Sequence, residues 1–349
     1  MDIIGGVFFH AAGASSAALC YTPQKKVMRW SWQTYWLAQA AVCWLLLPVI
    51  IAWVTIPHLI QVLSEAPTAS MWKSFVLGMA YGIGGTAFGV AIRYVGFSLT
   101  YAISVGISCV LGTLLPPLLK GELSGIIHNN GSGWIITGIA MGVLGIALCG
   151  IAGRYKEQDL SQKQSTALFN LSKGLPLCLL AGLLSAVYGF ALDQGQPLAD
   201  VAAKYGAGNF QGNVIYIFSN SGAFLSTLIY CLYLHSKQKT FAEYRKLQAS
   251  EKSTQLSFNF MMAAVTGILW YGQFFFYGLG HVRMGDFKFT GWAIHMIMLV
   301  LFSSLAGIIM KEWIAVKGRT RIALLSALAI LIIAVLVLTY GNYLGNITG

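Results

Sequence analysis

The sequence predicts an all-α polytopic membrane protein with ten transmembrane helices. Of its 349 residues, 57% are hydrophobic and only 9% are charged, and the mean hydropathy is +0.69. A soluble domain carries about 25% charged residues, so this composition excludes an ordinary soluble fold. At about 20 residues per span, the chain contains ten apolar segments. They cover residues 3–22, 34–56, 73–94, 95–119, 134–152, 173–193, 210–234, 258–280, 289–310 and 321–344.

The positive charges predict how these spans are oriented. Of the 22 Lys and Arg residues, 17 follow the odd-numbered spans and therefore belong to one side of the membrane. The side richer in Lys and Arg is the cytoplasmic side, so we expect both termini to lie outside. The net charge of +11 then serves orientation and contact with anionic lipid headgroups. It does not indicate a nucleic-acid partner.

The first four spans contain signals for close packing and for distortion. Small residues fill the span 3–22, which predicts close approach of neighbouring helices, and His10 lies about 10 Å below its outer end. A histidine there needs a partner or water, so it either bonds a neighbouring carbonyl or handles the proton or substrate. Pro48 and Pro57 at the end of the second span can kink or stop that helix. The third and fourth spans are joined so closely that they predict a tight hairpin near Gly96.

Two spans place polar side chains on one face. The stripes are Tyr101, Ser104 and Ser108 on the fourth span, and Asn213, Tyr216 and Asn220 on the seventh. A single stripe can simply join two helices through hydrogen bonds. Together with the polar face of the eighth span, however, the two stripes favour a shared polar cavity.

The stretch 266–286 carries the strongest functional signal. Its aromatic and polar side chains are Trp270, Gln273, Phe274, Tyr277 and His281, and the last four fall within about 60° of Trp270 on one helical face. Such groups cost free energy in hydrocarbon, so this face must look into the protein or a cavity. Aromatic rings beside a neutral amide suit a sugar, whose C–H patches stack on rings while its hydroxyls bond the amide. A well-packed aromatic interface between helices is the alternative.

The sequence predicts neither a cofactor nor an enzyme. The six cysteines lie in or at the ends of apolar segments and lack metal-ligand spacing. There is no P-loop, no nucleophile elbow and no zinc-binding His-Glu-x-x-His helix. Nothing in the chain therefore holds a nucleophile beside its base.

Ten spans divide into two sets of five, and an odd number in each set gives the halves opposite topology. This is the inverted-repeat arrangement of many transporters. We expect a first five-helix repeat over residues 1–152, a cytoplasmic linker over 153–172 and a second repeat over 173–349. Gly78 and Gly89 of the third span, and Gly96 just after it, match glycines 189 positions later at Gly267, Gly278 and Gly285, and Tyr81 likewise matches Trp270.

Several longer motifs resemble one family over nearly the whole chain. They are the opening FHAAGASSAALCYTPQKKVMRWSW, the run WYGQFFFYGLGH and the later IHM and MKEW. Together they resemble the bacterial L-rhamnose–proton symporters of the drug/metabolite transporter superfamily. The resemblance implies a multi-pass permease of the bacterial inner membrane that imports a 6-deoxyhexose with a proton. Family members carry a histidine at the position of His10. Asp193 departs from the family, where an uncharged residue is expected.

The leading interpretation is sugar–proton symport by alternating access, with sugar, proton and membrane lipid as the partners. The alternative is an exporter of amino acids or small metabolites on the same scaffold. We expect sugar contacts from His10, Tyr101, Ser104, Asn213, Tyr216, Asn220, Trp270, Gln273, Phe274 and Tyr277. Proton coupling is expected from His10, His281, Asp193 and Asp286, with Asp286 binding the proton and His10 relaying it or contacting the sugar. The sequence leaves the oligomeric state open.

Overall fold

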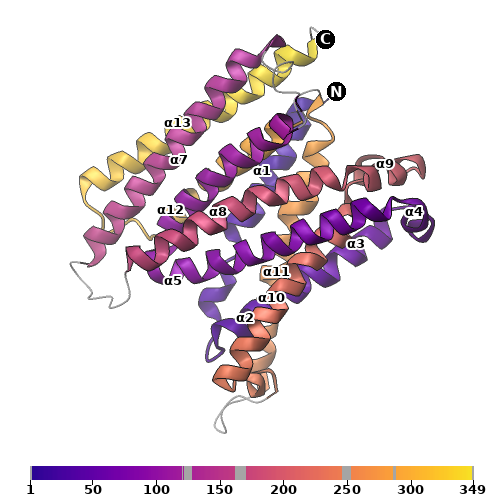
Figure 1. The fold of residues 1–349 in the computed structure, drawn as a ribbon. Helices are drawn as coiled ribbons and strands as arrows, with labels where there is room; N and C mark the ends of the chain where they lie inside the picture. Colours follow the sequence, from indigo (N-terminus) through magenta and orange to yellow (C-terminus); the bar gives the residue numbers. More distant parts are fainter. Residues whose placement is uncertain are drawn as a thin grey trace. The chain divides into compact units, whose positions relative to one another are not determined.

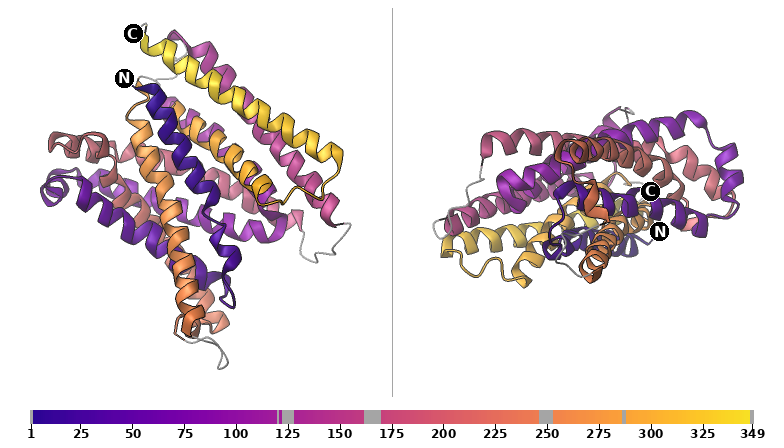
Figure 2. Two further views of the ribbon diagram at one scale, coloured as in Figure 1. Left: turned by 180° about the vertical axis from the view of Figure 1, so that it is seen from behind. Right: turned by 90° about the horizontal axis from the view of Figure 1, so that it is seen from below.

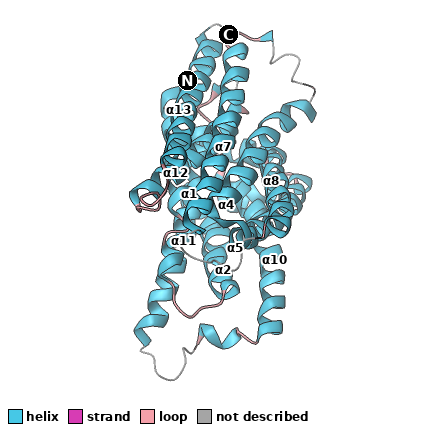
Figure 3. Cartoon of the chain, turned by 90° about the vertical axis from the view of Figure 1, so that its left-hand side faces the viewer, coloured by secondary structure: helices cyan, strands magenta, loops and turns pink. Residues whose placement is uncertain are grey.

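The computed structural model describes residues 2–119, 121, 128–161, 170–245, 253–285 and 288–347. Within these ranges the chain is almost entirely helical and contains no β-strand (Figure 3). Ten helical segments of the described residues are long and apolar enough to cross a membrane. The predicted all-α class and the predicted number of spans are therefore confirmed.

Most of the chain lies in long helices, which short 3₁₀ or π segments connect or interrupt. In chain order the elements are α1 (Ile3–Leu19), η1 (Pro23–Lys26), α2 (Trp32–Ala40), η2 (Ala41–Leu46), α3 (Leu47–Thr55), α4 (Leu59–Glu65), α5 (Thr68–Leu119), α7 (Ser132–Ser161), α8 (Leu171–Gln194), α9 (Gln196–Lys204), η3 (Gly208–Phe210), α10 (Asn213–Gln238), η4 (Phe241–Tyr244), α11 (Ser253–His281), α12 (Thr290–Ile309) and α13 (Gly318–Ile347).

The chain forms two compact units, each built from segments of both halves of the sequence. Unit 1 comprises Met1–Ala18, Gly84–Phe190 and Leu279–Gly349, and unit 2 comprises Leu19–Ile83 and Ala191–Gly278. The division into an N-terminal and a C-terminal repeat stays a prediction.

In unit 1, α7 and α13 lie side by side along most of their length (Figures 1 and 2). Glycines of α7 let the two helices approach. A β-carbon at Gly138 would lie 2.6 Å from Cγ of Leu338, and one at Gly145 would lie 2.6 Å from Cδ2 of Leu331. Larger residues at these positions would force the helices apart.

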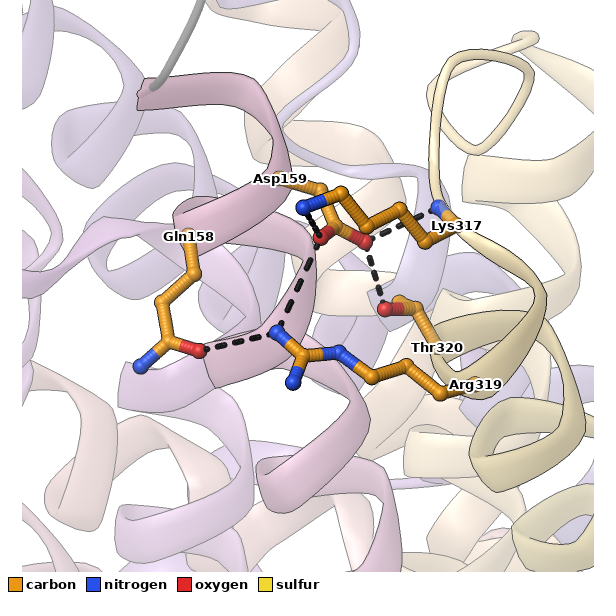
Figure 4. A network of polar contacts seen from close by, with 5 residues as sticks. All are labelled: Gln158, Asp159, Lys317, Arg319 and Thr320. Carbon is orange, nitrogen blue, oxygen red and sulfur yellow. Dashed lines mark hydrogen bonds and ion pairs between the residues drawn. The ribbon is translucent and has the colours of Figure 1, made fainter.

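A buried carboxylate ties the end of α7 to the start of α13 (Figure 4). The Asp159 side chain is 1% exposed, and one of its oxygens accepts hydrogen bonds from the backbone N–H of Lys317 at 2.9 Å and the hydroxyl of Thr320 at 2.6 Å. The other oxygen lies 3.8 Å from Nζ of Lys317 and 3.9 Å from a guanidinium nitrogen of Arg319. Asp159 therefore caps the first turn of α13 from a neighbouring helix.

Glycine also sets the geometry of α5. The helix contains two spans that meet at Gly96, where φ is 76° and the backbone leaves the helical region. Only glycine adopts this conformation without strain. This kink lies in the stretch 93–96, where the sequence predicts the tight hairpin.

In unit 2, the first part of α5 packs directly against the backbone of α10. A β-carbon at Gly78 would overlap the carbonyl of Ser219, and one at Gly222 would overlap the carbonyl of Phe75. The two glycines thus allow backbone-to-backbone contact. This contact fixes the part of α5 that carries Tyr81.

Candidate functional site

Unit 2 contains a cluster of aromatic side chains that we call the aromatic cage. Its members come from α2, η2, α5, α11 and the residues after α1, and they are Tyr21, Trp36, Trp44, Tyr81, Trp270 and Phe274. All six residues are buried, and none exposes more than 8% of its surface.

Trp270 lies at the centre of the cage. Its ring centroid is 5.4 Å from that of Tyr21, 5.5 Å from that of Trp36 and 5.1 Å from that of Trp44. The rings of Trp36 and Trp44 meet Trp270 nearly edge to face, at 77° and 69°. This is a favourable arrangement for aromatic pairs, so the indole of Trp270 is held from several sides.

The polar part of the cage lies around Tyr81. Its ring centroid is 5.9 Å from that of Trp44 and 6.3 Å from that of Phe274, and the side chains of Trp270 and Gln273 lie close to its hydroxyl. The amide of Gln273 is therefore beside the rings, as the helical face predicts. An aromatic wall and a neutral amide are present together in unit 2.

A π-helical segment brings the second span into the cage. Eight residues of regular α-helix turn through about 800°, which would leave Trp44 about 80° away from Trp36 around the axis. The π segment η2 turns less per residue, so both rings face Trp270. Pro48 follows, where a missing N–H favours such a distortion. Gly267 leaves room for the approach, because a β-carbon there would lie 2.6 Å from Cβ of Val42.

The polar residues of α10 make contacts within unit 2. Tyr216 donates a hydrogen bond to the carbonyl of Phe274 at 2.8 Å, and Asn213 donates one to the hydroxyl of Thr55 at 2.9 Å. Asn220 is fully buried on the same helix. The first two residues thus tie α10 to α11 and α3, and Tyr216 supports the backbone of the cage.

Tyr277 lies near both Asp193 and Tyr216. The carboxylate of Asp193 and the hydroxyl of Tyr216 are both close enough to Tyr277 to interact with it electrostatically. Asp193 therefore belongs to unit 2, near the C-terminal part of α11.

Unit 1 contains a second group of predicted residues, around His10. His10 is fully buried, and its ring centroid lies 5.9 Å from that of His295. His281, the last residue of α11, is close enough to interact electrostatically with His10. We call these three residues the histidine group.

Two glycines make room for the histidine group. A β-carbon at Gly280 or at Gly291 would lie 2.9 Å from Nε2 of His10. Arg283 lies nearby, with its guanidinium 4.6 Å above the ring of Phe9 and donating to the carbonyl of Leu279. The imidazole of His10 is thus held closely between α11 and α12.

The polar stripe on the fourth span joins helices of unit 1. Ser104 donates a hydrogen bond to the carbonyl of Cys178 at 3.0 Å, and Ser108 donates one to Ser185 at 2.9 Å. Tyr101 packs edge to face against Phe88, with centroids 4.9 Å apart. The two serines therefore serve as contacts between α5 and α8, which is the simpler of the two roles expected for such a stripe.

The sequence did not point to Tyr21, Trp36 or Trp44, whereas the 189-residue repeat matches Tyr81 to Trp270. A signal was present, because Trp36 and Gln39 repeat the Trp-x-x-Gln spacing of Trp270 and Gln273. Asp286, the predicted proton carrier, lies outside the described residues. Among the residues that the structure describes, no group of three or more His, Cys, Asp or Glu side chains could hold a metal ion.

Comparison with known proteins gives one consistent family. Residues 1–343 match the family model described as L-rhamnose-proton symport protein. The chain is 33% identical over 330 residues to the L-rhamnose-proton symporters of Klebsiella pneumoniae and Cronobacter sakazakii, and 32% identical to that of Escherichia coli. Each alignment covers 94% of this chain and 94% of the relative. The chain therefore belongs to the L-rhamnose-proton symport protein family.

Proposed function

We propose that this protein imports L-rhamnose, or a closely similar 6-deoxyhexose, together with a proton. The family is one of symporters, so the chain is a transporter and not an enzyme. The observation that carries the sugar assignment is the aromatic cage with Gln273 beside it. A pyranose presents C–H faces that stack on indole and phenyl rings and hydroxyls that bond an amide and a phenol.

The chemistry of the cage favours a neutral and partly apolar substrate. A 6-deoxyhexose has a methyl group in place of one hydroxyl, and the rings around Trp270 offer this group an apolar contact. An amino acid carries an ammonium and a carboxylate, and each would need an opposite charge in an apolar setting. Because no member of the cage is charged, import of a sugar is supported over export of an amino acid.

We assign proton binding to the histidine group of unit 1, with Asp286 as its carboxylate partner. An unperturbed imidazole titrates near pH 6.5, within the working range of a symporter, whereas an unperturbed aspartate titrates near 3.9. Two imidazolium ions about 6 Å apart would repel each other in a low dielectric. His10 and His295 are thus suited to carrying a single proton between them, while the assignment of Asp286 rests on the sequence.

Helix α11 provides a physical link between sugar and proton. It is one continuous helix that carries Trp270 and Gln273 in the cage and ends at His281 beside His10. Both groups are therefore carried by one helix, whose movement would couple sugar binding to proton binding during alternating access.

The proposed setting is the bacterial inner membrane, with both termini outside and the halves 1–152 and 173–349 as inverted repeats. The orientation can be tested by labelling introduced cysteines, since all six native cysteines are buried. A cysteine at the exposed position Lys204 should react with an impermeant thiol reagent from outside, and one at the exposed position Lys239 should not. The opposite labelling pattern would overturn the orientation.

The function is tested by transport in proteoliposomes with an inward proton gradient. Labelled L-rhamnose should accumulate, and L-mannose and L-lyxose should compete according to how well they reproduce its hydroxyls and methyl group. L-fucose tests tolerance of altered stereochemistry. Lack of saturable L-rhamnose uptake, with export of amino acids instead, would replace the proposal by its alternative.

A further inference from the structure

We propose that the second span forms a separate sugar-binding arm, in which the amide of Gln39 and the indole N–H groups of Trp36 and Trp44 bind sugar hydroxyls. This inference rests on the proposed function and deepens it. It adds a second set of polar groups for the sugar to those of Gln273 and Tyr81.

The first support is a concentration of buried polar atoms with no hydrogen-bond partner. Gln39 is fully buried, and neither its amide oxygen nor its amide nitrogen makes a hydrogen bond. The indole nitrogens of Trp36 and Trp44 and the hydroxyl of Tyr271 also make no hydrogen bond. These three residues are 1%, 0% and 4% exposed, respectively. Buried donors and acceptors of this kind cost free energy unless something binds them.

The same residue types elsewhere in the protein do have partners. Gln33, on the same helix as Gln39, donates to Gln238 at 3.0 Å and to Thr240 at 2.9 Å. The indole of Trp30 donates to the carbonyl of Glu243 at 3.0 Å, and that of Trp292 donates to the carbonyl of Ser108 at 3.0 Å. Missing hydrogen-bond partners are therefore specific to the Gln and Trp residues at the cage and are not typical of these residue types in this protein.

The geometry puts these atoms at the cage. The rings of Trp36 and Trp44 both contact Trp270, as described above. The backbone of Gln39 lies against α11 at Gly267, where a β-carbon would be 2.9 Å from the backbone carbonyl oxygen of Gln39. Trp270 stands three residues further along α11, on the next turn. The indoles of Trp36 and Trp44 thus contact the ring on which the sugar is proposed to stack, and Gln39 follows Trp36 by one turn of α2.

The chemical inventory fits a polyol. An amide supplies two N–H donors and a carbonyl acceptor, each indole supplies one donor, and a phenol supplies either. Sugar hydroxyls both donate and accept, so they satisfy such a mixed set. A charged ligand would meet no opposite charge at these four residues, which favours a neutral polyol as the occupant.

The experiment compares Gln39→Leu with Gln33→Leu in the full-length protein, using binding of labelled L-rhamnose and thermal melting without sugar. Gln39→Leu should weaken affinity by about tenfold or more, the effect of losing hydrogen bonds to a ligand. Its sugar-free melting temperature should stay equal or rise, since a buried unpartnered amide is removed. Gln33→Leu should lower the melting temperature and keep the affinity within about twofold, because it breaks protein contacts alone.

Trp36→Phe and Trp44→Phe give a second test that keeps the aromatic packing and removes only the N–H groups. Each should weaken L-rhamnose binding without loss of folded protein. Unchanged affinity in all three cage variants would overturn the inference, and so would a drop in melting temperature for Gln39→Leu that matches Gln33→Leu. In both cases the wild type would still bind L-rhamnose, whereas a wild type that fails to bind it would contradict the proposed function itself.

Discussion

Trp44 and Trp270 come from opposite halves of the sequence, yet their ring centroids lie 5.1 Å apart with ring planes at 69°. The π segment η2 turns Trp44 toward α11, and Gly267 leaves the space for that approach. Edge-to-face pairs of this kind contribute about 0.5–1.5 kcal/mol beyond the burial of their area. The pair therefore holds the central ring of the cage in a fixed orientation.

Replacing the central ring should remove the stacking surface for the sugar. We expect Trp270→Leu to weaken L-rhamnose binding by about tenfold or more, while Trp270→Phe, which keeps a ring, should weaken it less. Equilibrium binding of labelled sugar measures both. Trp134→Leu is a matched control, because Trp134 is 49% exposed and lies in unit 1. Equal losses in Trp134→Leu and Trp270→Leu would contradict a specific role for Trp270.

The amide of Gln273 should bind the sugar together with the hydroxyl of Tyr81. A hydrogen bond to a neutral group contributes about 0.5–1.5 kcal/mol, and an unpaired buried partner costs about 1–3 kcal/mol. Gln273→Ala should therefore raise the dissociation constant roughly tenfold in protein that still reaches the membrane. Tyr81→Phe should have a related effect, and the double variant should show less than the sum because the two groups share one network. Unchanged affinity in Gln273→Ala would reject the assignment.

Removing a proton-binding group should separate accumulation from exchange. We expect His10→Gln, His295→Gln and Asp286→Asn to abolish gradient-driven accumulation of L-rhamnose, because the proton no longer binds. Exchange of labelled for unlabelled sugar should persist, since exchange does not require release of the proton. Uptake and exchange in the same proteoliposomes measure the two activities.

The three variants also distinguish the candidate carriers from one another. A variant that still concentrates sugar against its gradient has lost no essential proton site. If Asp286→Asn accumulates sugar and the histidine variants do not, the carrier is the histidine group. Asp193→Asn is the next candidate if all three retain accumulation, because Asp193 lies beside Tyr277 near the cage.

Loss of the Asp159 carboxylate, which binds the start of α13, should lower the stability of the protein more than its transport activity. Asp159→Ala leaves the N–H of Lys317 and the hydroxyl of Thr320 without their buried acceptor, so its melting temperature should fall clearly. Arg319→Gln should change it little, because Arg319 is 56% exposed and its ion pair is screened by water. Thermal melting in detergent compares the two. An equal effect of both variants would show that the carboxylate matters only through its charge.

The sequence was informative where periodicity holds within one regular helix. Ten apolar segments predicted the ten spans, and the face of Trp270, Phe274 and Tyr277 was recognised because α11 is regular and all three rings are buried. Trp36 and Trp44 were missed for the opposite reason, since the π segment changes the angle between them and no α-helical pattern connects them.

The hydrogen-bond partners of polar side chains also could not be predicted from the sequence. A serine on an apolar helix can line a cavity or bond a neighbouring backbone, and Ser104 does the latter with Cys178. Asp159 stands in a segment whose charges are typical of a cytoplasmic end, and only the fold brings it to Thr320. Such partners depend on which helices become neighbours, which periodicity within one helix does not determine.

The most direct test of the account is proton movement driven by the sugar itself. L-rhamnose is added to proteoliposomes that hold a pH-sensitive dye, with no proton gradient imposed. We expect the interior to acidify as sugar enters with protons in wild type and in Trp134→Leu, to acidify only at higher sugar concentrations in Trp270→Leu, and not to acidify in His10→Gln. Saturable entry of L-rhamnose without any change of internal pH would contradict proton symport, the central claim.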